Sequence, residues 1–297
     1  MTSAPPGRFA GLSDNLRGAL WMVTAMAGFA VEDVFLKSVT RHMPLGQALL
    51  IFGLVGVIVF SLLARRHGEV ILHPALLSRP LLIRSSFEVT GRLFYSLAIA
   101  LTPLSVASAI LQATPLVVVA GAAIFFGETV GWRRWTAIVV GFVGVLVILR
   151  PGLDGFTLMS LVTVVGLMGF AGRDLATRAA PIALSNRQLG IVGMAMLALA
   201  GAIILTVTGG ARLPDATGMA QVTAMTAAGI FAYYALTIAM RTGQVAAVTP
   251  FRYTRLVFAM ILGVLVFDEH PDALTLVGSA LIVGSGLYTL ARSRRRT

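Results

Sequence analysis

The 297-residue sequence contains no cysteine. This absence excludes a disulfide framework, a thiol nucleophile and a cysteine-ligated metal. The four histidines fall in segments that connect apolar runs, and no pair has the spacing of zinc ligands, so we expect no metal site. No glycine-rich phosphate loop, Ser-His-Asp set or HExxH motif is evident. The sequence therefore indicates neither ATP-driven pumping nor a bound cofactor.

Charged residues are scarce as well. They make up 12% of the chain, whereas a typical soluble domain has about 25%. Hydrophobic residues make up 57% and the mean hydropathy is +0.90, so the lipid bilayer is the expected solvent. In a soluble protein the net charge of +11 would raise nucleic acid as a partner. In a membrane protein such cations set the orientation in the bilayer, and we expect no nucleic-acid partner.

Long hydrophobic runs are what the sequence has in abundance. A helix needs about 20 mostly apolar residues to cross a hydrocarbon core about 30 Å thick. Suitable segments lie at 17–38, 44–64, 80–100, 104–127, 132–150, 156–178, 186–208, 217–240, 245–267 and 272–291. We therefore predict an all-α membrane protein with ten transmembrane helices. The connecting loops are short and leave no room for a soluble catalytic domain.

The distribution of arginine and lysine predicts the orientation. If both termini are cytoplasmic, the inner connecting segments hold most of the cations. The outer segments then hold only Lys37, Arg41, Arg150 and Arg212. Because membrane proteins concentrate these residues on the cytoplasmic side, we predict that both termini are cytoplasmic.

One stretch of the first segment occurs again in the sixth. Gly28-Phe29-Ala30 is followed by Asp33 and Lys37, and 141 residues later (174 minus 33) a second Gly-Phe-Ala is followed by Asp174 and Arg178. Gln47 and Glu128 also recur at this separation, as Gln188 and Glu269, and we expect the two glutamates to make helix-end contacts. Each copy would hold five helices, and an odd number makes the second copy enter the membrane from the opposite side. We predict two inverted five-helix repeats, 17–150 and 151–291, between a tail at 1–16 and a basic tail at 292–297.

The same organisation resembles a known family. Ten helices as five plus five, Pro115 leading to Phe125-Phe126-Gly127-Glu128, and Pro250-Phe251-Arg252-Tyr253 leading to Phe267-Asp268-Glu269 resemble the EamA branch of the drug/metabolite transporter superfamily. The pattern looks most like the aromatic amino acid exporters of that branch. The resemblance implies export of small metabolites, amino acids among them, across the bacterial inner membrane.

The third segment carries the clearest ionisable set. Arg84, Glu88, Arg92 and Tyr95 follow one another at steps of four, four and three, so they share one helix face. Glu88 and Arg92 form either a self-neutralising pair or a cavity wall that meets a charged substrate group. Tyr95-Ser-Leu-Ala-Ile-Ala resembles a stretch that begins at Tyr234, 139 residues later (234 minus 95). By that alignment the repeat does not copy the two charges, which favours a substrate role.

The ninth segment carries Arg252 and Arg255 on either side of Tyr253. Arginine binds a carboxylate with two hydrogen bonds, so these residues are candidates for substrate binding. The alternative is that both extend to the interface or pair with an acid.

Polar and aromatic residues complete the candidate site. Ser105, Ser108, Gln112 and Pro115 form a stripe along the fourth segment that either bonds substrate or packs helices. Trp21 and Tyr234 are candidate aromatic walls.

The two repeated acids suggest gates. Asp33 is expected near the outer face and Asp174 near the inner face, and each precedes a cation, Lys37 or Arg178, by four residues. The simpler interpretation is a pair of helix-end ion pairs. The sharper one is that each acid contacts partner helices when its side of the protein closes.

These observations favour a secondary transporter that exports amino acids, including aromatic ones, by alternating access. A carrier of phosphorylated or sugar-linked metabolites is an alternative that would rely on the arginines alone. A membrane enzyme that uses Asp33, Glu88 and Asp174 as acid/base groups is a weaker alternative, because catalysis does not need an inverted repeat.

Overall fold

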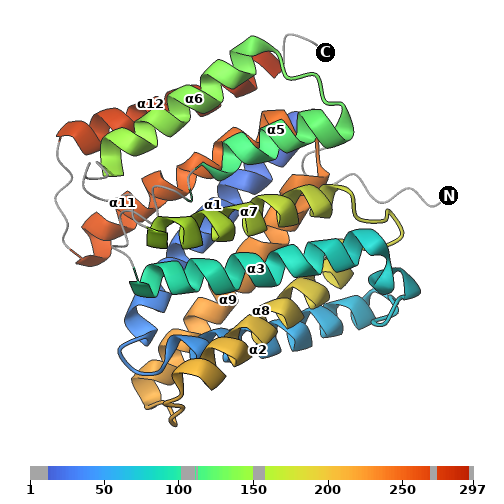
Figure 1. Cartoon of the computed structure of the whole chain (residues 1–297), viewed down its shortest axis with the longest axis vertical. Coiled ribbons are helices and arrows are strands. Elements are labelled where there is room, and N and C mark those ends of the chain that lie inside the picture. Colours follow the sequence, from blue (N-terminus) through green and yellow to red (C-terminus); the bar gives the residue numbers. More distant parts are fainter. Residues whose placement is uncertain (1–12, 102–110, 112, 150–157, 268–272, 294–297) are drawn as a thin grey trace.

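The computed structural model describes residues 13–101, 111, 113–149, 158–267 and 273–293, and every regular element in these ranges is helical (Figure 1). The long helices are α1 (Asp14–Val39), α2 (Leu45–Arg66), α3 (Arg79–Leu101), α5 (Thr114–Phe126), α6 (Trp132–Leu149), α7 (Leu158–Arg178), α8 (Asn186–Thr208), α9 (Ala216–Arg241), α11 (Thr254–Phe267) and α12 (Ala273–Ser293). Short elements are η1 (Pro74–Leu77), α10 (Val245–Val248) and η2 (Thr249–Tyr253).

Four of the described helices are long and apolar enough to cross a membrane on composition alone. They are the Asp14–Leu36 part of α1, together with α2, α8 and α9. The all-helical character that the sequence predicts is thus confirmed for the described residues.

Two predicted spans differ from the expected continuous helices, and a proline stands at each break. The segment 245–267 divides into α10, η2 and α11, and Pro250 lies at the start of η2. Pro115 lies in the first turn of α5, which begins at Thr114 after a turn at Ala113. A proline has no N–H to donate and is tolerated only in the first turn of an α-helix. Each proline therefore starts a new helix within its span.

The helices pack as antiparallel pairs, and glycines bring their backbones together. The pairs are α2 with α8, α1 with α9, α3 with α7, and α6 with α12. In Figure 1, α6 and α12 lie at the top, α3 and α7 in the middle and α2 and α8 at the bottom, while α1 passes behind α3 and α7. A methyl group added at Gly53 would lie 2.4 Å from the backbone nitrogen of Ala198, and one added at Gly144 would lie 2.7 Å from the carbonyl oxygen of Gly278. Small residues of this kind let membrane helices approach closely without a hydrophobic driving force.

A contact in the α1–α9 pair has a counterpart in the α3–α7 pair. The counterpart is found by adding 141 to the residue number in the first half of the chain and subtracting 141 from the number in the second half. Gly28 faces Ala232, and Gly169 faces Gly91. These two contacts exchange under that operation, because 28 plus 141 is 169 and 232 minus 141 is 91. The separation in α3 and α9 is therefore 141 at this contact, and not the 139 that the Tyr95 and Tyr234 stretches indicate.

Candidate functional site

A cluster of charged side chains occupies the middle of the bundle, where an apolar core would be expected. We call it the central cluster. It is made of Glu32 and Asp33 from α1, Arg84, Glu88 and Arg92 from α3, Arg173 and Asp174 from α7, Tyr233 from α9, Arg252 from η2 and Arg255 from α11. Ionisable groups inside membrane helices are costly, so such a concentration marks a functional region.

Glu88 is the most enclosed member, with no exposed side-chain surface. Its Oε2 accepts a hydrogen bond from the Tyr233 hydroxyl at 2.9 Å, and its Oε1 accepts one from Arg173 Nη1 at 3.3 Å. Arg84 Nη2 donates to the same tyrosine at 2.5 Å and lies 3.8 Å from the carboxylate. Arg92 Nε lies 3.7 Å from Glu88 Oε1, so the predicted Glu88–Arg92 pair is present as one part of a larger network.

Asp174 joins this network to the broken helix. Arg173 Nη2 lies 2.8 Å from its Oδ1, and Arg252 bonds its Oδ2. The pairing expected with Arg178 is replaced by these two partners. The reason is that an acid enclosed in the bundle takes the nearest buried cations, and Asp174 is 1% exposed.

Asp33 and its partner Arg255 form the more exposed end of the cluster. Arg255 donates to both of its carboxylate oxygens, through Nε at 2.9 Å and Nη2 at 2.6 Å. The Asp33 side chain is 44% exposed and that of Arg255 is 30% exposed, so exposure rises along the cluster away from Glu88. The side chain of Lys37 lies outside the described residues.

The two repeated acids therefore lie closer together than their places in α1 and α7 indicate. They bond Arg255 and Arg252, which are three residues apart on one helical segment, and such a step is about 5 Å. Asp33 and Asp174 belong to one central cluster.

The doubled Gly-Phe-Ala stretch supports the cluster in the same way on both helices. Each glycine lies at a close helix contact, as described above. Each phenylalanine lies beside a guanidinium: Arg255 is 5.1 Å from the centre of the Phe29 ring, and Arg173 is 5.1 Å from that of Phe170. An aromatic face attracts such a cation, so the repeat places one arginine beside each acid.

Three polar atoms in the cluster have no hydrogen-bond partner among the described residues, and one of them is Arg84 Nη1, on a guanidinium that bonds Thr177 and Tyr233 through its other nitrogens. The other two belong to side chains that make no hydrogen bond within the described residues. They are Glu32 Oε2 and Arg92 Nε, and both are buried. Glu32 is 4% exposed, and the charges that act on it are those of Arg92, Asp33 and Arg255. A buried charge without a partner is costly, so these atoms mark the part of the cluster that is not completed by the protein.

A model of the EamA-like transporter family matches the chain twice, over residues 16–150 and 155–291. The chain belongs to the EamA-like transporter family. It is accordingly a multi-pass membrane protein and a transporter, which sets aside the enzyme alternative.

Relatives of this EamA-like transporter carry the names of several substrates. The chain is 29% identical to a riboflavin transporter of Rhizobium johnstonii, covering 94% of this chain and 92% of the relative. It is 24% identical to an S-adenosylmethionine uptake transporter of Rickettsia prowazekii, covering 96% of both chains. It is 27% identical to a pseudopaline exporter of Pseudomonas aeruginosa, covering 90% of this chain and 93% of the relative. A crystal structure with 21% identity superposes with a TM-score of 0.79 over 94% of this chain and 98% of that one, which shows the shared fold.

The remaining predicted site residues of the EamA-like transporter lie at varying distances from the cluster. Tyr95 packs edge-on against Phe170, with ring centres 5.8 Å apart, and so adjoins it. Tyr253 is fully buried and its hydroxyl donates to the Ile138 carbonyl at 3.3 Å, whereas Tyr234 packs on Phe60. Trp21 packs on the apolar core around α1. Ser105, Ser108 and Gln112 lie outside the described residues.

Sequence reasoning did not single out Glu32 or Arg173 as site residues. Each of them adjoins an aspartate in the doubled stretch, Asp33 or Asp174. That adjacency within a predicted span is the signal that would have revealed them. The expected helix-end role of Glu128 is confirmed, since its carboxylate accepts from the N–H groups of Val245 and Ala246 at the start of α10.

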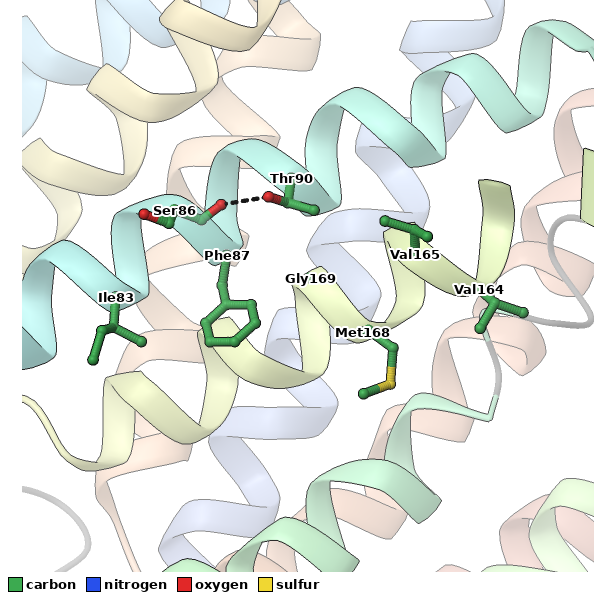
Figure 2. A pocket seen from close by; sticks show the side chains of 8 residues that line it. All are labelled: Ile83, Ser86, Phe87, Thr90, Val164, Val165, Met168 and Gly169. Atoms are coloured by element: carbon green, nitrogen blue, oxygen red, sulfur yellow. Dashed lines mark hydrogen bonds between the residues drawn. The ribbon is translucent and has the colours of Figure 1, made fainter. Parts of the chain in front are cut away.

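A cavity of about 490 Å³ lies between α3 and α7, on faces other than those that carry the cluster (Figure 2). Its lining is apolar apart from Ser86 and Thr90, and the two hydroxyls bond backbone carbonyls of their own helix. Glu88 and Arg92, on the same helix, do not line it. The residues that line this cavity therefore provide no charged group for a charged substrate.

Proposed function

We propose that the chain is a secondary transporter of the bacterial inner membrane that exports amino acids, including aromatic ones, and related small metabolites by alternating access. The observation that carries this proposal is the incompletely paired central cluster beside the helix break at η2. In transporters, broken helices near the midplane supply substrate sites, because their ends leave polar groups free within the bilayer.

The contact pattern supports two inverted repeats. Exchanging the halves converts the α1–α9 pair into the α7–α3 pair, and it maps α2–α8 and α6–α12 onto themselves. Individual contacts follow: Gly190 faces Phe60, and Gly201 faces Leu49, which the 141-residue exchange interconverts. In the α2–α8 and α6–α12 pairs, which the exchange maps onto themselves, the two helices run antiparallel. A two-fold axis in the membrane plane requires this.

The exposure gradient supports an outward-facing arrangement. With both termini cytoplasmic, Asp33 lies in the outer half of α1, and this is the more exposed end of the cluster. Glu88 and Arg84 are sealed toward the cytoplasmic side. Alternating access then requires the Glu88 side to open while the Asp33 side closes.

A carrier of phosphorylated or sugar-linked metabolites is the second candidate. The observation that favours it is that arginines outnumber carboxylates in the cluster. A phosphate group would use Arg92, Arg252 and Arg255, which retain some exposure. The two candidates differ in whether the site needs a free acid.

Transport by purified protein in liposomes tests the proposal. The liposomes that contain the protein are filled with L-phenylalanine, S-adenosylmethionine, riboflavin or a sugar phosphate. Exchange is followed by adding the same compound, labelled, to the outside. We expect exchange of an amino acid above the level of empty liposomes, with and without a pH gradient. If none of these compounds exchanges, the carrier proposal is wrong, and exchange of the sugar phosphate alone would favour the second candidate.

The orientation is tested separately, and the absence of cysteine makes this direct. Single cysteines are introduced at Leu72, Ile182 and Leu213, which are 83%, 96% and 97% exposed. We expect a membrane-impermeant maleimide to label Leu213→Cys in intact spheroplasts, and to label Leu72→Cys and Ile182→Cys only after lysis. The reverse pattern would place the termini outside.

A further inference from the structure

Glu32 and Arg92 are an acid and an arginine of the central cluster whose hydrogen-bonding capacity is not satisfied within the described residues. The two side chains come from α1 and α3, and each has a buried polar atom with no partner among the described residues. Glu32 adjoins Asp33, the partner of Arg255, and Arg92 lies beside Glu88, so both belong to the central cluster, where the charge of Arg92 acts on Glu32. Yet they do not bond each other, and Arg92 Nε also stays 3.7 Å from Glu88 Oε1.

The rest of the cluster does not complete this pair. Arg255 is engaged by both oxygens of Asp33, and Arg252 by Asp174. Glu88 is occupied by Tyr233 and Arg173. Arg84 Nη1 also lacks a partner, but the same guanidinium is fixed by Thr177 and Tyr233. Glu32 and Arg92 are therefore the acid and the arginine of the cluster whose side chains make no hydrogen bond within the described residues.

The chemistry of the two atoms defines a molecule from outside that would satisfy both. A buried carboxylate oxygen requires a cationic donor, and a buried guanidinium N–H requires an anionic acceptor. An ammonium and a carboxylate on one small molecule satisfy both at once, and the complex adds no net charge to the bilayer interior. A phosphate ester satisfies only the arginine and leaves the acid unpaired.

We propose that Glu32 binds the ammonium group, and Arg92 the carboxylate, of a zwitterionic substrate of the amino-acid class. This rests on the proposed transport function and names the residues that select its substrate. Phe170 lies beside the site, with its ring centre 5.7 Å from Arg92, and Tyr95 packs on that ring. These rings provide an apolar wall for the substrate's side chain.

Binding to purified protein in nanodiscs tests the pairing, with three related probes measured by calorimetry at pH 7. They are L-phenylalanine, 3-phenylpropionate, which lacks the ammonium, and phenethylamine, which lacks the carboxylate. We expect the wild type to prefer L-phenylalanine by about 10- to 100-fold over each truncated probe, because each loses one charged hydrogen bond. Glu32→Gln should abolish the preference over 3-phenylpropionate only, and Arg92→Gln the preference over phenethylamine only.

The control is Asp14→Asn, at an exposed acid in the first turn of α1. It should keep both preferences, and thermal melts should show that all variants are folded. If Glu32→Gln retains the full preference for L-phenylalanine, Glu32 does not bind the ammonium. The pairing is equally wrong if this variant changes only the pH dependence of exchange in liposomes, since Glu32 would then carry a proton. A wild type that exchanges riboflavin but binds no zwitterion, S-adenosylmethionine included, would overturn this inference and leave the transporter proposal intact.

Discussion

Two glutamates in the centre of this transporter have opposite surroundings. Glu88 is held by Tyr233 and Arg173, with Arg84 and Arg92 close by. Glu32 is equally removed from solvent, but its Oε2 has no partner among the described residues. A buried acid with several donors is part of the framework, whereas one without them awaits a ligand or a proton. The difference separates the structural part of the cluster from the part that acts on substrate.

The largest loss of stability is expected from removing Arg173, the cation that pairs with two acids of the framework. Arg173→Met leaves both Glu88 and Asp174 without their shared partner, and breaking a buried ion pair costs about 3–5 kcal/mol. We expect a lower unfolding temperature and poor yield in detergent. Arg66→Met, at an exposed cation in the last turn of α2, is the comparison. Equal melting of the two variants would mean that Arg173 does not hold the framework together.

The sequence predicted the general architecture because apolar runs and repeated motifs are local signals. It predicted Glu88 and Arg92 together for the same reason, since they are four residues apart on one helix. It missed the partners of Asp33 and Asp174 because these arginines come from α11 and η2, more than 70 residues away in sequence. The expected pair with Arg178 followed helix spacing alone, which cannot anticipate a cation that another helix brings to Asp174.

The same substitution at the two glutamates should have opposite effects on stability. Glu88→Gln removes the charge that balances the surrounding arginines and should cost about 3 kcal/mol. Glu32→Gln removes a charge that has no hydrogen-bonded partner and should raise the unfolding temperature slightly. Thermal melts in detergent, without substrate, measure both changes. If both variants melt lower by similar amounts, Glu32 belongs to the framework and the distinction between the two acids fails.

A smaller effect is expected from crowding the tyrosine that bonds Glu88. A methyl group added at Gly193 would stand 1.7 Å from the Tyr233 hydroxyl oxygen, so Gly193→Ala must displace it from the carboxylate. Overpacking of this kind costs about 1–3 kcal/mol. Gly284→Ala is the matched control, because nothing lies within 4 Å of the added methyl.

The double variant identifies the cause. Tyr233→Phe removes the hydroxyl that the new methyl would meet, so Gly193→Ala should cost less in a Tyr233→Phe background than in the wild type. Additive costs for the two changes would show that the methyl disturbs α8 and not the bond to Glu88.

The smallest effect is expected at a paired glutamate outside the cluster, where water moderates the charges. Burial acts to raise the pKa of Glu69, but hydrogen bonds from Arg187 and Ser185 outweigh it and hold the pKa below its ordinary value of 4.5. An acid whose pKa is lowered on folding stabilises the protein fully above its unfolded value, and this contribution is lost as pH falls through the folded value. The unfolding temperature should therefore decline below pH 4.5 in the wild type, and less steeply in Glu69→Gln. The contribution should be about 1 kcal/mol or less, because the pair lies at the end of the bundle. Parallel pH profiles for the two proteins would show that Glu69 does not contribute, and would leave the buried acids as the source of any acid sensitivity.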